Sequence, residues 1–223
     1  TSNSKIAAVN GHRIKGVKTG TATITLSVAG VSRKIRVTVV KAPTSVKLNR
    51  TSLTVSAGET VELLATLPNA VGTVAWKTGD TDIAAIEKTE VVNGNTTKVL
   101  LRTAKAGTVT ITATSYDGKK KATCKLRVTE APTGVVFAEE SYSVSEGATV
   151  QMSVAVLPAG GNYTVRYEVE DETVASVGDA GRLTAKREGT TFVTAKVLDY
   201  RTGTILAAKA QVLVTPGFEK LEI

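Results

Sequence analysis

The stretch GTVTITA at residues 107–113 decides the fold of this chain. Its apolar residues alternate with threonines, which is the period of two residues expected of a strand with one buried and one exposed face. Valine, isoleucine and threonine also favour the extended backbone, because branching at Cβ suits the pleat. The phrase returns as GTATI at residues 20–24 and as GTTFV at residues 189–193, so the strand belongs to a repeated unit.

The phrases around this strand repeat as well and mark where each unit begins and ends. APTSV at residues 42–46 returns as APTGV at residues 131–135. The other recurring phrases are LTVSAGETV at 53–61 with YSVSEGATV at 142–150, ATLP at 65–68 with AVLP at 155–158, IAAV at 6–9 with IAAI at 83–86 and VASV at 174–177, and the closing strands KIRVT at 34–38, KLRVT at 125–129 and AQVLVT at 210–215.

These repeats predict four segments along the chain. Residues 1–41 are the second half of one unit, residues 42–130 and 131–216 are complete units, and residues 217–223 are the start of a further one. We expect both ends to be cut from a longer chain. Because residues 1–41 lack the first-half strands, we expect this segment to be incompletely packed or covered by another element.

Each complete unit is expected to hold about seven short strands, joined by turns every 8–12 residues. Asp117-Gly118 is a strong hairpin signal, since both residues tolerate positive φ, and the matching turns are Ala29-Gly30 and residues 200–203. No apolar face with 3.6-residue spacing is sustained for three turns, so no helix is predicted. The fold class is therefore all-β, with tandem immunoglobulin-like antiparallel β-sandwiches.

The order of these motifs resembles bacterial immunoglobulin-like domains of group 2, over essentially the whole chain. Tyr167 stands in the later unit where the earlier one has Trp76, and the Ser-Asp-rich phrase usual after the Trp reads KTGD at residues 77–80. The motifs that carry the resemblance are Val46 and Leu48, LTV at 53–55, Gly58, Leu63 and Ala65, LP at 67–68, Trp76, IAAI at 83–86 and GTVTITA at 107–113.

The resemblance implies an extracellular location at a bacterial cell surface, or alternatively in a phage virion. Domains of this family act as spacers in adhesins, cell-wall proteins, secreted polysaccharide-acting enzymes and phage structural proteins, and some arrays bind host molecules. The family pattern contains no catalytic residue and no cofactor. Its shared positions are core and turn positions, so none carries over as a functional site.

Composition excludes several classes of site. The chain has one cysteine, Cys124, and one histidine, His12, so an internal disulfide and a zinc site with four Cys or His ligands are both excluded. No stretch approaches the roughly 20 apolar residues that a membrane helix needs. No basic-then-apolar signal peptide opens the sequence, but the chain begins mid-pattern at Thr1, so we expect that a signal could have been cut away. The net charge of +8 is uneven: residues 1–41 carry eight basic and no acidic residues, whereas residues 131–223 carry eight basic and twelve acidic residues.

Individual residues that could carry chemistry each have a structural interpretation that we favour. Trp76 could stack on a sugar, but Tyr167 replaces it in the next unit, which indicates a core aromatic. His12 has no nucleophile motif beside it and follows a predicted Asn10-Gly11 turn, so we expect it to be exposed. Cys124 falls on the inward face of a strand, where the later unit has Ala210, so we expect a buried and inert thiol.

Three charged or glycine-rich features also have structural interpretations that we favour. Residues 119–121 are lysines beside a hairpin, where solvated side chains also deter edge-to-edge pairing. The basic segment 1–41 could bind an anionic glycan, teichoic acid or an acidic neighbouring domain, but no recognition helix or interleaved aromatics point to nucleic acid. The glycines at 20, 107 and 189 lack a phosphate-loop motif and are turn glycines.

An acidic cluster in the last complete unit offers oxygen ligands of the type that Ca²⁺ takes. It lacks the D-x-D-x-D-G spacing of a calcium loop, so we expect a solvated sheet edge instead. Its members are Glu168, Glu170, Asp171 and Glu172, with Asp179 nearby.

The sequence therefore predicts a non-catalytic spacer in a bacterial surface or secreted protein, with no metal, cofactor or catalytic residues. Its expected partners are neighbouring Ig-like domains of the same chain. Three alternatives stay open: an adhesin module that binds a host protein or glycan, an accessory region of a secreted carbohydrate-active enzyme, and a phage structural or decoration protein.

Overall fold

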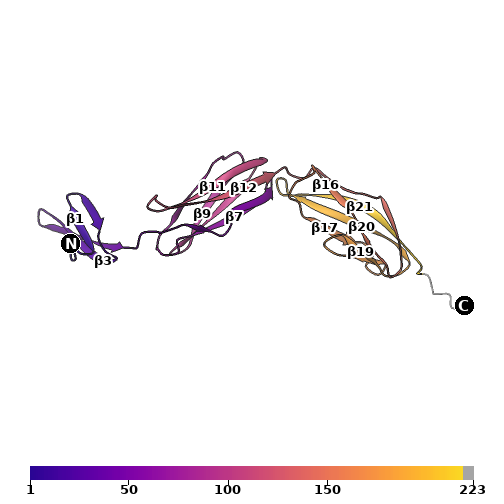
Figure 1. Ribbon diagram of the computed structural model, residues 1–223, viewed down its shortest axis with the longest axis horizontal. Coiled ribbons are helices and arrows are strands. Elements are labelled where there is room, and N and C mark those ends of the chain that lie inside the picture. The colour runs from indigo at the N-terminus through magenta and orange to yellow at the C-terminus, as the bar shows by residue number, and fades with distance from the viewer. Residues whose placement is uncertain (218–223) are drawn as a thin grey trace.

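The computed structural model describes residues 1–217 and is all-β over that range. Three bodies follow one another end to end in an elongated row, and the body at the N-terminus is the smallest (Figure 1). We call them the N-terminal segment (residues 1–41), the middle unit (42–130) and the C-terminal unit (131–216), and these boundaries remain a prediction from the sequence. Of the predicted start of a further repeat at 217–223, all but Gly217 lies outside the described residues.

The middle unit is a sandwich of two four-stranded sheets. One sheet has the order β5-β7-β10-β9 and the other β6-β12-β11-β8, with β6 parallel to β12 and the other pairs antiparallel. The strands are β5 (Lys47–Leu48), β6 (Ser52–Ser56), β7 (Thr60–Thr66), β8 (Val74–Thr78), β9 (Ala84–Asn93), β10 (Thr96–Thr103), β11 (Gly107–Ser115) and β12 (Lys121–Thr129). This is the predicted immunoglobulin-like arrangement.

The core of the middle unit lies between these two sheets and is mostly aliphatic. In β11, Val109, Ile111 and Ala113 are buried, as the alternation predicted. The largest wholly buried side chains around them are Leu63, Leu67, Leu101 and Leu126. Burying a side chain of this size stabilises the fold by about 1.5–3 kcal/mol, so a chain with few aromatics can still hold a sandwich together.

The C-terminal unit has a similar arrangement, with one interruption. Its sheet β14-β21-β20-β17 faces two smaller groups of strands, β15-β19-β18 and β13-β16, because the strand that corresponds to β7 is broken at Met152-Ser153. The strands are β13 (Gly134–Phe137), β14 (Ser141–Ser145), β15 (Thr149–Gln151), β16 (Val154–Leu157), β17 (Val165–Val169), β18 (Ala175–Val177), β19 (Arg182–Ala185), β20 (Gly189–Asp199) and β21 (Thr204–Thr215).

The N-terminal segment consists of two separate hairpins. Strand β1 (Ala7–Asn10) pairs with β2 (Arg13–Gly16), and β3 (Gly20–Val28) pairs with β4 (Val31–Val39). Ala7, Ala22 and Ile24 are buried, but most other apolar side chains of the two hairpins are exposed. The segment is thus incompletely packed, because it has none of the strands that correspond to β5–β8.

The register of the hairpins corrects one detail of the repeat. The sequence match paired KIRVT at 34–38 with KLRVT at 125–129. In the structure Ile24 lies opposite Ile35, whereas Ile111 lies opposite Cys124, so Ile35 corresponds to Cys124 and not to Leu126. The sequence match was therefore wrong by two residues. A shift of two keeps every side chain on its face, which is why the alternation alone did not reveal it.

Candidate functional site at the interdomain joints

The aromatic and thiol candidates are core residues, as predicted. Trp76 and Tyr167 occupy equivalent places, opposite Ala113 and Ala195, and both pack against the hydrophobic cores of their units. Cys124 is fully buried, and burial raises the pKa of its thiol, which makes it a poor nucleophile.

The polar candidates lie at exposed positions that already have structural roles. His12 is exposed beside Gly11, whose φ of 56° makes the turn between β1 and β2. The lysines at 119–121 are exposed around the β11–β12 hairpin, as predicted. That hairpin is closed by a hydrogen bond from Ser115 N–H to the carbonyl of Lys120.

The acidic cluster is distributed over ion pairs and a turn. Glu168 pairs with Lys196, and Glu170 lies 2.6 Å from Lys209. Asp171 accepts hydrogen bonds from the side chain and the backbone N–H of Thr173, and these bonds hold the pKa of its carboxyl below the ordinary value. Within residues 1–217 no three His, Cys, Asp or Glu side chains gather as a metal site would need.

The turn at Asp171 occurs in all three bodies and was not singled out from the sequence. Asn3, Asp80 and Asp171 each accept a backbone N–H from two residues ahead, at 2.8–3.0 Å. Each also accepts, through its main-chain carbonyl, the N–H of the alanine four residues ahead. This Asx turn leads the chain into β1, β9 and β18. Asn3, Asp80 and Asp171 are therefore equivalent positions from which the residues of the three bodies can be matched.

The feature with the most cross-body contacts is the joint between the middle and C-terminal units. The linker Ala131-Pro132 is buried there, and proline fixes its own φ. The carbonyl oxygen of Glu130 accepts hydrogen bonds from Ser56 Oγ of the middle unit, at 3.2 Å, and from Tyr163 Oη of the C-terminal unit, at 3.1 Å. One backbone oxygen therefore ties both units to the same point of the linker.

The loop that carries Tyr163 makes a second bond across the same joint. The backbone N–H of Asn162 donates to Thr129 Oγ1 at 3.0 Å, and Thr129 in turn donates to the carbonyl of Val55 inside the middle unit. The Tyr163 hydroxyl also lies 3.1 Å from the carbonyl of Pro158 in its own loop. Burial, followed by the nearby Glu130 carboxylate, raises the pKa of Tyr163, so the hydroxyl remains a donor over an extended range of pH.

A further contact at this joint is a close approach of two backbones. A Cβ on Gly58 would lie 2.3 Å from the backbone nitrogen of Arg201, so only glycine fits. Arg201 is held by the buried carboxylate of Asp199, which accepts the Arg201 N–H at 2.9 Å and the Thr202 hydroxyl at 3.0 Å. Burial tends to raise the pKa of Asp199, but these hydrogen bonds and the Arg201 charge outweigh it and hold the pKa below the ordinary value.

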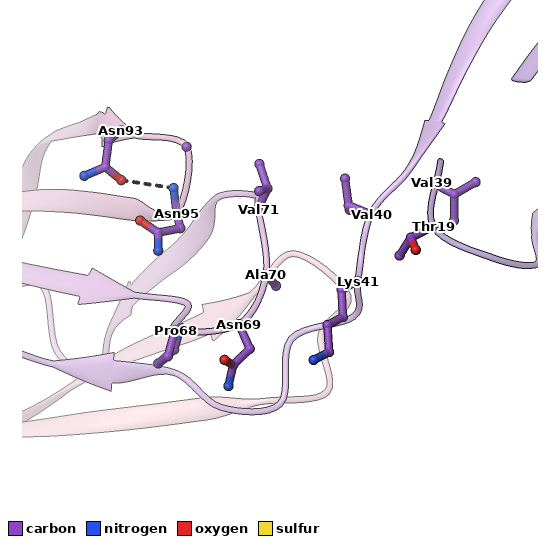
Figure 2. Close-up of a pocket in the computed structure, with 11 residues that line it drawn as sticks. Thr19, Val39, Val40, Lys41, Pro68, Asn69, Ala70, Val71, Asn93 and Asn95 are labelled. Carbon is purple, nitrogen blue, oxygen red and sulfur yellow. Dashed lines mark hydrogen bonds between the residues drawn. The ribbon is translucent and has the colours of Figure 1, made fainter. Parts of the chain in front are cut away.

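At the joint between the N-terminal segment and the middle unit, another tyrosine hydroxyl donates to the carbonyl that precedes the linker. Tyr116, in the β11–β12 hairpin, donates to the carbonyl of Lys41 at 3.1 Å. Lys41 precedes Ala42-Pro43 as Glu130 precedes Ala131-Pro132. Beside this contact lies an open groove of about 660 Å³, where Val40 and Lys41 run between Thr19 and Val39 of the N-terminal segment and the loop Pro68–Val71 (Figure 2).

The two tyrosines come from loops that do not correspond. By strand register Tyr163 corresponds to Gly72, and Tyr116 corresponds to Leu198. A Cβ built on Gly72 would lie 2.4 Å from the ring of Tyr116, so the tyrosine ring packs directly against this glycine. In an alignment of the repeats each tyrosine stands opposite a residue that is not a tyrosine. The sequence therefore gave no sign that both tyrosines donate to the carbonyl before an Ala-Pro linker.

Comparison with known proteins finds one family model that matches most of the C-terminal unit. The family model described as bacterial Ig-like domain (group 2) matches residues 131–205. An uncharacterised protein of Clostridium acetobutylicum is 31% identical over 170 residues, which is 75% of this chain and 16% of that protein. The chain thus spans less than a fifth of that relative.

Solved structures that match most of this chain have lower sequence identities. Surface layer protein SbsC, domains 4–9, is 19% identical with a TM-score of 0.38, over 91% of this chain and 36% of that one. Invasin, a bacterial integrin-binding protein, is 14% identical with a TM-score of 0.43, over 90% and 46%. A chimeric titin Z1Z2 is 16% identical with a TM-score of 0.42, over 80% and 100%.

Proposed function

We propose that this chain, whose residues 131–205 match the bacterial Ig-like family model, is a non-catalytic spacer of a bacterial cell-surface or secreted multi-domain protein. The observation that carries the proposal is the tyrosine contact at each joint. In both joints a tyrosine of the downstream body donates to the carbonyl that precedes the Ala-Pro linker. A spacer needs joints that hold a direction, and these contacts supply one. The described residues contain no helix that could span a membrane.

Small interfaces between domains of one chain ordinarily permit relative motion. A hydrogen bond of this kind contributes about 1 kcal/mol, enough to bias the joint several-fold toward one orientation. The joint next to Glu130 also has the Asn162–Thr129 bond and the Gly58–Arg201 contact, whereas the joint next to Lys41 borders an open groove. We therefore expect the former to be the stiffer of the two.

The test is Tyr163→Phe, which removes one hydroxyl and keeps the ring. Spin labels on the two units should show a broader distance distribution by pulsed dipolar spectroscopy. Tyr200→Phe is the matched control, because among the described residues its exposed hydroxyl makes no hydrogen bond. Equal distributions for the two variants would remove the tyrosine contact as the basis of a directed spacer.

A second candidate function is recognition of a host protein or glycan by the C-terminal unit. A groove of about 450 Å³ on its outer face is lined by Leu198, Tyr200 and Ile205, which are 39%, 43% and 59% exposed, and by charged residues that include Arg166 and Lys196. An aromatic ring beside charged groups is a typical recognition surface. Binding to a glycan array or matrix-protein panel that is lost in Tyr200→Ala would support this role, and silence of the wild-type chain across both would remove it.

A further inference from the structure

The two sheets of the middle unit differ in how the charges on their outer faces are balanced. On the sheet β5-β7-β10-β9, basic and acidic side chains pair with one another. The strands of the sheet β6-β12-β11-β8 contain no acidic residue at all. Their exposed basic side chains, all turned away from the core by strand alternation, are Lys77, Lys121, Lys125 and Arg127. The ion pairs of the first sheet are Lys98 with Glu62 and Glu90, Lys88 with Glu90, and Arg102 with Glu87.

The carboxylates that border the basic face in the sequence do not neutralise it. Asp80, after β8, accepts the N–H of Asp82 at 2.9 Å. Asp117, in the β11–β12 hairpin, accepts the hydroxyl of Ser115 at 2.6 Å, and Glu130 lies at the joint. Within residues 1–217 none of the four basic side chains forms an ion pair, so their charge is available to an external anion.

Hydroxyl side chains flank two of these cations and add uncharged hydrogen-bond donors to the face. The neighbours on adjacent strands are Thr54 and Thr108 for Arg127, and Ser52 and Thr110 for Lys125. All six residues are exposed, and all but Thr110 line a hollow of about 490 Å³, together with Leu53. A guanidinium or ammonium group with hydroxyls beside it suits an anion that has several acceptor oxygens.

The cations lie in a line along β12, which sets the spacing of the charges that they can meet. Side chains on one face of a strand recur every second residue, at about 6.8 Å. Arg127, Lys125 and Lys121 therefore occupy three of four successive sites, and Thr123 occupies the fourth. Phosphates joined by three-carbon polyols recur at a closely similar interval when the chain is extended, so each repeat would meet one donor.

The other outward side chains of the face argue against two further kinds of anionic partner. None of them is aromatic, so the bases of a nucleic acid would have nothing to stack on. Ala75 is the only apolar one, so an acidic protein would find no apolar centre of the kind that protein interfaces bury. The planar fork of Arg127, in contrast, matches two oxygens of one phosphate.

We propose that the outer face of β6-β12-β11-β8 binds a linear phosphodiester polymer of small polyols, extended along β12. The Arg127 guanidinium donates to one phosphate within the hollow, where the hydroxyls of Thr54 and Thr108 lie beside it. Lys125 and Lys121 neutralise further phosphates along the strand. This binding is a function additional to that of a spacer and does not depend on the stiffness of the joints.

The corresponding face of the C-terminal unit lacks the site. By strand register, Gln211 and Leu213 stand where the middle unit has Lys125 and Arg127. Its own outward lysines on β20 and β21 are paired with glutamates of β17. The C-terminal unit thus shows which uncharged residues a sheet of this type accepts at the two positions.

The test is calorimetric titration of the full chain with a synthetic glycerol phosphate oligomer at several salt concentrations. Single-stranded polyphosphates lose affinity with salt at a logarithmic slope of about −0.7 per phosphate contacted, so three contacts should give a slope of about −2. Lys125→Gln combined with Arg127→Leu copies the C-terminal unit and should weaken binding by roughly tenfold or more and reduce the slope to about −0.7. Arg127→Lys keeps the charge but not the fork, so it should retain the slope and still bind less tightly.

A matched variant separates this face from net charge. Lys88→Gln combined with Arg102→Leu removes the same two charges from the opposite sheet and should change the affinity by no more than about twofold, because screened charges act over about 8 Å. Absence of binding by the wild-type chain, or equal losses in the two double variants, would overturn the proposal. Equal or tighter binding of a thymidine oligonucleotide with the same number of phosphates, or of a glutamate oligomer of the same charge, would identify another class of partner and would also overturn it.

Discussion

Gly58 gives the sharpest test of the joint between the middle and C-terminal units. Its φ is +91°, and a Cβ there would lie 2.3 Å from Arg201 N and 2.7 Å from Tyr200 C. Ordinary contact begins at 3.4 Å, so Gly58→Ala must push these backbones apart by about 1 Å. Both partners are backbone, and Asp199 holds the hairpin from within, so a side-chain rotation cannot relieve the clash.

The displacement can be converted into a change of direction. A gap of about 1 Å on one side of a sandwich about 10 Å thick tilts the next unit by roughly 6°. A strand of about 12 residues spans about 40 Å, so the far end of the C-terminal unit should move by roughly 4 Å. Alanine at positive φ also destabilises the middle unit by about 1–2 kcal/mol.

Gly147 is the matched control, because it occupies the equivalent turn of the C-terminal unit. Its φ is +80°, and a Cβ there would meet nothing within 4 Å. Both alanine variants therefore carry the backbone strain, but only Gly58→Ala carries the clash. Spin labels at exposed positions 119 and 188 in a Cys124→Ala background would report the distance between the units. A shifted or broadened distance distribution in Gly58→Ala alone is expected, and identical distributions for the two variants would refute the argument.

Three further predictions concern stability. Tyr142→Phe should leave the C-terminal unit as stable or more stable by about 1 kcal/mol in chemical denaturation, because the Tyr142 hydroxyl is buried without a partner among the described residues; a clear loss would show that the hydroxyl is satisfied. Leu101→Ala should destabilise its unit by about 2–5 kcal/mol, whereas Ile14→Ala at the equivalent but half-exposed position should cost far less; similar losses would show that the N-terminal segment is closed in solution. The folded-state pKa of Asp199 lies below its ordinary value of 3.8, so its contribution to stability is present above that pH and is lost as the pH falls through the folded pKa. Asp199→Asn should flatten this acid limb, and an unchanged pH profile would show that Asp199 does not govern it.

Much of the fold could be predicted from local pattern. Apolar residues at alternate positions define strands wherever they occur, and the repeat of GTVTITA identifies corresponding strands without any knowledge of the fold. The same pattern placed Cys124 in the core, because the face of a strand is set by parity alone, whereas Trp76 was placed there because Tyr167 replaces it in the next unit. It could not detect the two-residue shift of β4, which preserves parity.

The candidate site could not be predicted, because its contacts have no period. Asp117-Gly118 predicted a hairpin, but not that the neighbouring Tyr116 reaches the carbonyl of Lys41. Tyr163 makes the equivalent contact from an unrelated loop. The contacts of a loop side chain depend on the conformation of the whole loop. Neighbours in sequence do not determine that conformation in the way that alternation determines the two faces of a strand.

The sequence by itself determined the strand-rich sandwich type, the aliphatic core and the order of repeats, since these depend on alternation and turn residues close together in the chain. Only the tertiary structure decided how the bodies meet: that Glu130 offers one carbonyl to two units, that Gly58 is glycine because Arg201 lies against it, and that Ile14 is open where Leu101 is covered. These features join residues far apart in sequence, and their energies depend on distances that no local pattern specifies.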